Sequence, residues 1–367
     1  MKQQVNPLVF SIISFECLFG TGTMEWIPVW LRGLHTNVWI SFAAYALLST
    51  AFAYLVLRSA QRLSGGFSGC TMLDLYLGKR VGGVLNLCLA GAFIVCSART
   101  LSLCAWLMHY AALPYTPGIA LILLCLLTPV QLLHGGMDAL FRFQTALYWP
   151  TLILALLLLC VSFKDADFAN LLPVTASVHA SVMQVISRTL DLLPGITLIM
   201  VYLPVFIQLG ITSRQSFINY LWASAGVIAL NMLNLVIVLS VLGPFEGASL
   251  QWPILEIVRI QKMTGPLLER LDLIFFLTVI ICMISAVNLS MYGAYRIFVH
   301  YVHPRSLHTM VWAIVALVLF AVIPDDFDSL DRVYAYVFRF FEFVTFGLLL
   351  AIWLRGRVHT RNGRDTA

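Results

Sequence analysis

The first apolar run of the sequence combines an acidic residue with residues that oppose a continuous helix. Glu16 lies near its middle, Gly20 and Gly22 follow, and Pro28 comes shortly afterwards. A break here leaves backbone N–H and C=O groups unpaired, and such groups are tolerated in a membrane only where protein or a cavity satisfies them. The freed groups can bind a carboxylate and a cation. Alternatively, the glycines allow a neighbouring helix to pack closely.

A second interruption of the same kind occurs at Pro194-Gly195, with Pro204 further along the same apolar run. Proline removes a backbone donor, so an unbroken helix is disfavoured at this point. Two broken helices at the first and sixth runs are consistent with two related halves that bind a small ligand between them. The candidate ligand-binding residues are Gly20, Thr21, Gly22, Thr23, Gly195 and Thr197.

Ionisable residues inside the apolar runs are the next candidates. Glu16 and Arg99 are the clearest, and each is expected to face the helix bundle because a lone charge in hydrocarbon is costly. They can pair with each other, or one can serve a ligand or a proton. Two further pairs, at spacing i,i+3, are interpreted as structural: Arg188 with Asp191, and Arg339 with Glu342.

Signs of catalysis or metal binding are weak. No Walker A, GxSxG, HExxH or CxxC motif occurs in the sequence. His300, His303 and His308 surround one predicted turn, but no further ligand is evident beside them. We therefore expect no enzyme activity, no catalytic residue, no metal site and no cofactor.

The amino-acid composition predicts the class of protein whose helices position these residues. The chain has 367 residues, of which 60% are hydrophobic and 11% charged, whereas a soluble domain has about 25% charged residues. This excludes a soluble enzyme and predicts an all-α polytopic membrane protein, with residues 1–367 in a single transmembrane domain. Ten apolar runs are expected to span the membrane, at about 7–31, 38–57, 84–110, 118–133, 145–163, 182–209, 217–242, 267–297, 309–323 and 334–354.

Loop charges predict the orientation. With the N-terminus in the cytoplasm, thirteen Lys and Arg residues fall on the cytoplasmic side and six on the other. The positive-inside rule then places both termini in the cytoplasm. The basic tail, residues 355–367, is expected to lie beside anionic lipid. The net charge of +5 is thus a membrane feature, and no nucleic-acid partner is expected.

The segment from 252 to 276 is the most distinctive part of the sequence. It contains WPILEIVR and then LLERLDLIFF. Pro253 is expected to start a short helix that ends by Gly265-Pro266. Glu269 and Asp272 then share a face at the start of the next helix, where Arg259 or Arg270 can pair with them. The residues assigned a structural role are Pro253, Glu256, Arg259, Glu269, Arg270 and Asp272.

These two motifs resemble the signature of the B-subunit family of bacterial spore germinant receptors, which is similar to the amino acid–polyamine–organocation transporters. The chain length, the ten runs and the break at Gly20 to Gly22 agree with this resemblance. The resemblance implies a five-plus-five inverted repeat with helices 1 and 6 broken. The first repeat would cover about 7–163 and the second about 182–354.

The resemblance also implies a role. Such subunits recognise small nutrients, often amino acids, in the inner membrane of the spore, together with an A subunit (a larger membrane protein) and a C subunit (a lipoprotein). Two alternatives stay open from the residues alone. One is a proton- or sodium-coupled secondary amino-acid transporter with Glu16 as the proton carrier. The other is a structural subunit that binds no ligand.

Overall fold

The computed structural model describes most of the chain. The described residues are 7–20, 26–34, 37–62, 72–172, 194–208, 213–260, 271–302 and 307–322, together with 336, 337, 340 and 347.

Helices make up nearly all of the described part. The long ones coincide with the apolar runs of the sequence, because a backbone in lipid must satisfy its own hydrogen bonds. The α-helices are α1 (Pro7–Gly20), α2 (Trp26–Leu34), α3 (Val38–Arg62), α4 (Met72–Ala111), α5 (Gly118–Ser162), α7 (Pro194–Gln208), α8 (Ser213–Ser249), α9 (Pro253–Ile260), α10 (Leu271–Val302) and α11 (Leu307–Val322). Two short 3₁₀ helices, η2 (Phe163–Asp165) and η3 (Phe168–Leu171), follow α5.

The two predicted interruptions fall at helix ends. In the first apolar run, α1 ends at Gly20 and α2 begins at Trp26. In the sixth run, α7 begins at Pro194, a position that suits proline because the first N–H groups of a helix have no intrahelical acceptor. Residues 21–25 and 173–193, and with them Arg188 and Asp191, lie outside the described residues. Arg339 and Glu342 in the tenth run lie outside them as well.

The fourth and fifth runs are joined more directly than expected. We predicted a loop between 133 and 145, but the helical segment α5 continues through this region with a sharp kink at Gly136 (φ 77°, ψ −170°). A positive φ of this kind is readily adopted only by glycine. The single residue Gly136 therefore changes the direction of the chain, and the two helical segments are joined without a loop of several residues.

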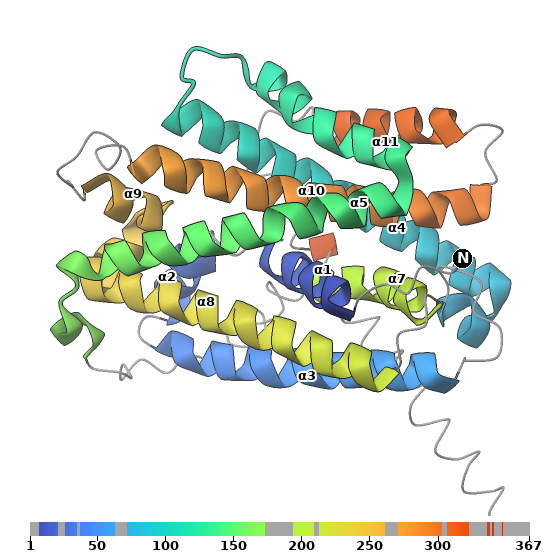
Figure 1. Ribbon diagram of the computed structural model, residues 1–367, viewed down its shortest axis with the longest axis horizontal. Coiled ribbons are helices and arrows are strands. Elements are labelled where there is room, and N and C mark those ends of the chain that lie inside the picture. Colours follow the sequence, from blue (N-terminus) through green and yellow to red (C-terminus); the bar gives the residue numbers. More distant parts are fainter. Residues whose placement is uncertain are drawn as a thin grey trace, which may run out of the picture.

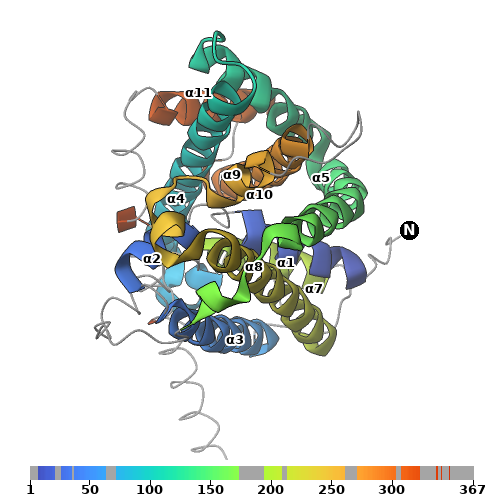
Figure 2. The same cartoon turned by 90° about the vertical axis from the view of Figure 1, so that its left-hand side faces the viewer.

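The helices are arranged around α1. This helix packs against α8 on one side and against α10, α7 and α5 on the others. In turn, α10 lies between α4 and α5, and α8 covers α2 and α3 (Figure 1, Figure 2). The residues of α1 thus lie at the centre of the described bundle.

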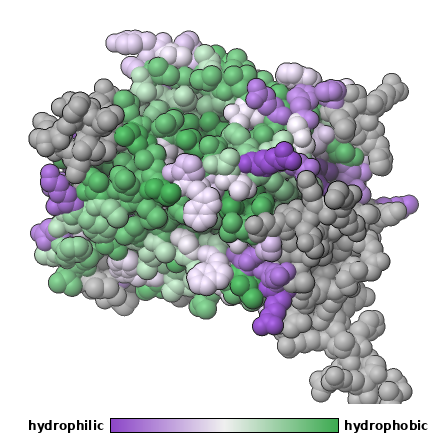
Figure 3. Space-filling model, in the orientation of Figure 1, coloured by the Kyte–Doolittle hydropathy of each residue, from purple (hydrophilic) through white to green (hydrophobic). Residues whose placement is uncertain are grey.

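The outer surface is suited to a bilayer. Five helical segments of the described part are long and apolar enough to cross one, from Val38–Leu55 to Asp272–Tyr301. On the face shown in Figure 3, hydrophobic residues cover most of the described surface, while hydrophilic residues gather toward its two ends. Because lipid is as apolar as the core, packing contacts and hydrogen bonds must hold the helices together.

Several buried hydrogen bonds join helices that are distant in sequence. Ser97 on α4 lies 2.7 Å from Ser290 on α10, measured between the two hydroxyl oxygens. The Ser49 and Tyr220 hydroxyls are also 2.7 Å apart and link α3 to α8. The Tyr202 hydroxyl donates to the Leu289 carbonyl at 2.7 Å and links α7 to α10.

Candidate functional site

Glu16 occupies the centre of the bundle. It lies on α1 with 9% of its surface exposed, and its Oε2 has no hydrogen-bond partner among the described residues. This oxygen therefore does not bind Arg99, which is itself buried on α4. A charged residue at the middle of a membrane helix costs about 3 kcal/mol even on insertion scales. An unpaired carboxylate oxygen at such a place is a candidate ligand contact.

A cavity lies beside this carboxylate. The space open to the centres of water-sized molecules is about 30 Å³, and about 10–15 Å³ suffices for one water. Four helices contribute its wall. The lining residues are Phe15, Glu16 and Phe19 of α1, Tyr148, Thr151, Leu152 and Ala155 of α5, Leu230 of α8, and Ile281, Cys282 and Ser285 of α10.

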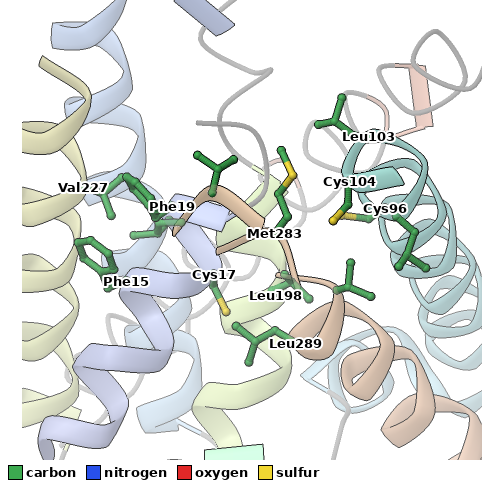
Figure 4. Packing of buried hydrophobic residues seen from close by; sticks show 14 of the residues in the cluster. Phe15, Cys17, Phe19, Cys96, Leu103, Cys104, Leu198, Val227, Met283 and Leu289 are labelled. Atoms are coloured by element: carbon green, nitrogen blue, oxygen red, sulfur yellow. The ribbon is translucent and has the colours of Figure 1, made fainter. Parts of the chain in front are cut away.

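The orientation of α1 determines what faces the cavity. Phe15 points toward Val227 of α8, whereas Cys17 points toward Leu198 and Leu289 (Figure 4). The Phe15 ring also meets the Tyr148 ring edge to face, with centroids 5.2 Å apart. Phe15, Glu16 and Phe19 therefore form one face of α1 over the cavity, and the Phe15, Phe19 and Tyr148 rings share its wall with the carboxylate.

Polar groups extend this site along α10. The Gln144 amide donates to the Ser285 carbonyl at 3.0 Å, but the Gln144 Oε1 has no partner. Asn288 lies one turn beyond Ser285, and neither its Oδ1 nor its Nδ2 has a hydrogen bond among the described residues. Buried polar atoms are nearly always paired in proteins. Unpaired atoms on α1, α5 and α10 thus indicate a polar region that water or a ligand can satisfy.

The distinctive segment around Trp252 forms a separate structural contact. Pro253 is the first residue of α9, and Glu256 forms an ion pair with Arg259 at 3.2 Å. The Tyr110 hydroxyl at the end of α4 donates to Glu256 Oε1 at 3.0 Å. The Arg259 guanidinium lies 4.8 Å from the centre of the Tyr110 ring, within cation–π range. These contacts link α9 to the end of α4.

Among the described residues, Arg259 therefore forms its ion pair with Glu256, one turn earlier on the same helix. Asp272 lies in the first turn of α10. Glu269 and Arg270 lie outside the described residues.

We expect Glu256→Ala to destabilise the folded protein by about 1–2 kcal/mol, because it removes a charged hydrogen-bond acceptor and a partly exposed ion pair. Glu256→Gln keeps an acceptor for Tyr110, so a smaller loss is expected. Thermal unfolding in detergent measures both. Glu246→Ala, at an exposed acid on α8, is the matched control. An unfolding temperature equally unaffected by all three substitutions would contradict a stabilising role for this link.

Comparison with known proteins identifies the family. A model described as "Spore germination protein" matches residues 4–330. The chain belongs to this family. Spore germination proteins A2 and B2 of Bacillus subtilis (strain 168) are 22% and 21% identical to it. Each alignment covers 98% of this chain, with 100% of the first relative and 98% of the second.

Solved structures similar to this germination protein show the fold. MhsT in complex with L-phenylalanine has a TM-score of 0.65 at 15% identity, over 91% of this chain and 86% of that one. A manganese transporter from Eremococcus coleocola has a TM-score of 0.61 at 12% identity, over 94% and 77% of the two chains. The predicted fold class, an all-α membrane protein of the APC/LeuT type, is therefore confirmed. This family member is an integral membrane protein of the germinant receptor or permease type.

Of the described ligand-binding residues that were expected from the sequence of this germination protein, Gly20 lies next to the cavity wall. Gly20 is the last residue of α1, one residue beyond Phe19 in the cavity wall. Gly195 and Thr197 lie in the first turn of α7, which packs against α1, and Thr197 is buried. The other three candidates lie outside the described residues: Thr21, Gly22 and Thr23.

Sequence reasoning missed the far wall of the cavity. Tyr148, Thr151, Cys282 and Ser285 line it, yet none was singled out. One weak signal was present, because Cys282, Ser285 and Asn288 repeat at i,i+3 along an otherwise apolar run and so share a helix face.

Proposed function

We propose that this family member is the nutrient-sensing membrane subunit of a spore germinant receptor and that it binds a small amino acid. The observation that carries the proposal is the cavity beside the unpaired Glu16 Oε2, directly before the end of α1. A carboxylate in an apolar wall favours a cationic group, and the ammonium group of an amino acid supplies one.

The second end of the ligand has candidate partners in the interruption that follows the same helix. Gly20 follows Glu16 by four residues, or about 6 Å along a helix axis. Unpaired backbone N–H groups after α1 would meet the ligand carboxylate, as broken helices do in transporters of this fold. Thr21, Thr23 and Thr197 would offer hydroxyl groups. The small cavity favours an amino acid with a short side chain.

Sensing follows if the ligand binds one conformation more tightly than another, since only differential affinity can shift an equilibrium between states. We infer that this subunit acts with an A subunit and a C subunit, a membrane protein and a lipoprotein, in the inner spore membrane. Both termini would lie in the cytoplasm, with residues 355–367 against anionic lipid. Repeats at about 7–163 and 182–354 would form the two halves of the site.

Gly20→Leu tests the site. A leucine side chain at the end of α1 is expected to abolish the nutrient response of spores while the level of the protein in the membrane is unchanged. Gly91→Leu is the matched control, because a side-chain carbon added at Gly91 meets no atom within 4 Å. A full response in Gly20→Leu spores would overturn the site assignment.

A proton- or sodium-coupled amino-acid transporter is the second candidate, and two observations favour it: the buried Glu16, whose Oε2 has no hydrogen-bond partner, and the similarity to solved transporters. Uptake into proteoliposomes under an imposed ion gradient separates the two functions. Stoichiometric uptake by this chain without partners would favour the transporter. A saturable thermal shift with one amino acid but no uptake would favour the sensor, and no shift with any amino acid would favour a structural subunit.

A further inference from the structure

Two histidines from distant parts of the chain meet at a bend of α5. His134 precedes the kink at Gly136, and His308 lies in the first turn of α11, 174 residues later. Their Nδ1 atoms are 3.0 Å apart, and the ring centres are 4.8 Å apart. Both side chains are exposed. The sequence offered only the His300 to His308 turn as a candidate, so this partner could not be seen there.

The chemistry of this contact is unusual. A neutral imidazole carries one N–H and one lone pair, so two facing Nδ1 atoms form a hydrogen bond only if one of them carries the proton. A metal ion between them instead accepts a lone pair from each ring. Both Nε2 atoms then carry their protons toward water.

The spacing also fits a metal ion. Two metal–nitrogen bonds of about 2.0–2.1 Å whose nitrogens lie 3.0 Å apart enclose an angle of about 94°. This is close to the right angle between neighbouring ligands of an octahedral ion. A movement of about 0.3 Å would widen it to the tetrahedral angle that Zn²⁺ prefers.

We propose that His134 and His308 form a binding site for a divalent transition-metal ion of the zinc or nickel class. Imidazole nitrogens suit these ions. Among the described residues no third histidine, cysteine or acidic side chain joins the pair, so water completes the coordination at this exposed position. The ion ties α11 to the segment of α5 that precedes its kink, and it would hold these two elements in one relative position.

Titration of the full-length protein in detergent tests the site. The protein should carry a tag without histidine and be treated with a chelator beforehand. ZnCl₂ or NiCl₂ alone is then added, and calorimetry is expected to show one equivalent bound and a raised unfolding temperature, since the ion binds only the folded state. His134→Ala and His308→Ala should each weaken binding by about tenfold or more, because even outer-shell changes cost about 10–100-fold.

His300→Ala is the matched control, at an exposed histidine on α10 that lies against Tyr301, and it should leave the affinity unchanged. The Trp312 ring lies 6.3 Å from the His134 ring, so Ni²⁺ should quench its fluorescence, and Trp312→Phe should remove that part of the quenching. The proposal is overturned if no saturable binding occurs, or if binding survives in both His134→Ala and His308→Ala.

Discussion

Replacing Glu16 with glutamine is expected to weaken amino-acid binding by about 10- to 100-fold, because a hydrogen bond to a charged group contributes about 1.5–3 kcal/mol. Glutamine has nearly the same shape, so the cavity and the packing of Phe15 and Phe19 around it should be preserved. The substitution also removes a buried ionisable group whose Oε2 has no partner. The unfolding temperature without ligand should therefore be unchanged or higher.

The measurement is the concentration of amino acid that gives half of the maximal thermal shift, for the purified chain and for Glu16→Gln. Ser14→Ala is the control on the same helix, because Ser14 is buried and its hydroxyl is also unpaired. Ser14 lies outside the cavity wall, so this variant should bind as the unmodified chain does. An affinity for Glu16→Gln within about threefold of the unmodified chain would exclude the carboxylate from the ligand site.

A second substitution tests whether the ligand occupies the cavity itself or only contacts the Glu16 carboxylate. Ser285→Leu adds volume to the α10 side of the cavity, which has about 30 Å³ for small molecules. If the ligand occupies this space, Ser285→Leu and Glu16→Gln should both weaken binding, the first by exclusion and the second by loss of charge. If only Glu16→Gln weakens binding, the ligand contacts Glu16 without filling the α10 side of the cavity.

The long helices of the described part were predictable from sequence because lipid imposes one strong physical constraint. Apolar runs must be helical, and the described helices follow them. The connection at Gly136 was not predictable in the same way. His134-Gly135-Gly136 has the composition of a loop, yet a single positive φ at Gly136 lets two helices join directly.

Of the residues that line the cavity, only the charged one, Glu16, could be predicted from the sequence. Glu16 stands out because an acid is rare in an apolar run. Thr151, Cys282 and Ser285 are small residues of the kind that any buried helix face contains. Their role depends on which faces of α5 and α10 turn toward α1, and tertiary packing decides this. Likewise, the hydrogen bond from Tyr110 to Glu256 joins residues 146 positions apart, and no local pattern indicates it.

Gly82→Ala is expected to cause the largest loss of stability among glycine-to-alanine substitutions at the glycines whose surroundings are described. Gly78, with φ 81° and ψ 156°, turns the start of α4 back on itself, so that Asp74 lies against Gly82. A side-chain carbon at Gly82 would lie 2.5 Å from the Asp74 Cα and 2.7 Å from its backbone nitrogen. Backbone atoms cannot rotate away, so the two segments must separate.

This separation would also break a polar cluster. The Asn86 amide donates to Asp74 Oδ1 at 3.3 Å and to the Tyr301 hydroxyl at 2.7 Å. The Tyr301 hydroxyl in turn donates to Asp74 Oδ2, which ties the start of α4 to the end of α10. Overpacking costs about 1–3 kcal/mol, and unpaired buried polar groups add about 1–3 kcal/mol. Gly82→Ala is therefore expected to lower stability by about 3 kcal/mol or more.

Gly91→Ala on the same helix is the matched control. Nothing lies within 4 Å of an added side-chain carbon there, so a neutral effect or a gain of up to about 1 kcal/mol is expected from helix propensity. Asp74→Ala should not rescue Gly82→Ala, since the clashing Cα and nitrogen atoms remain. Thermal unfolding of the single and double variants measures this. A full rescue would show that the Asp74 side chain, and not the close approach of the two backbone segments, limits what Gly82 can become.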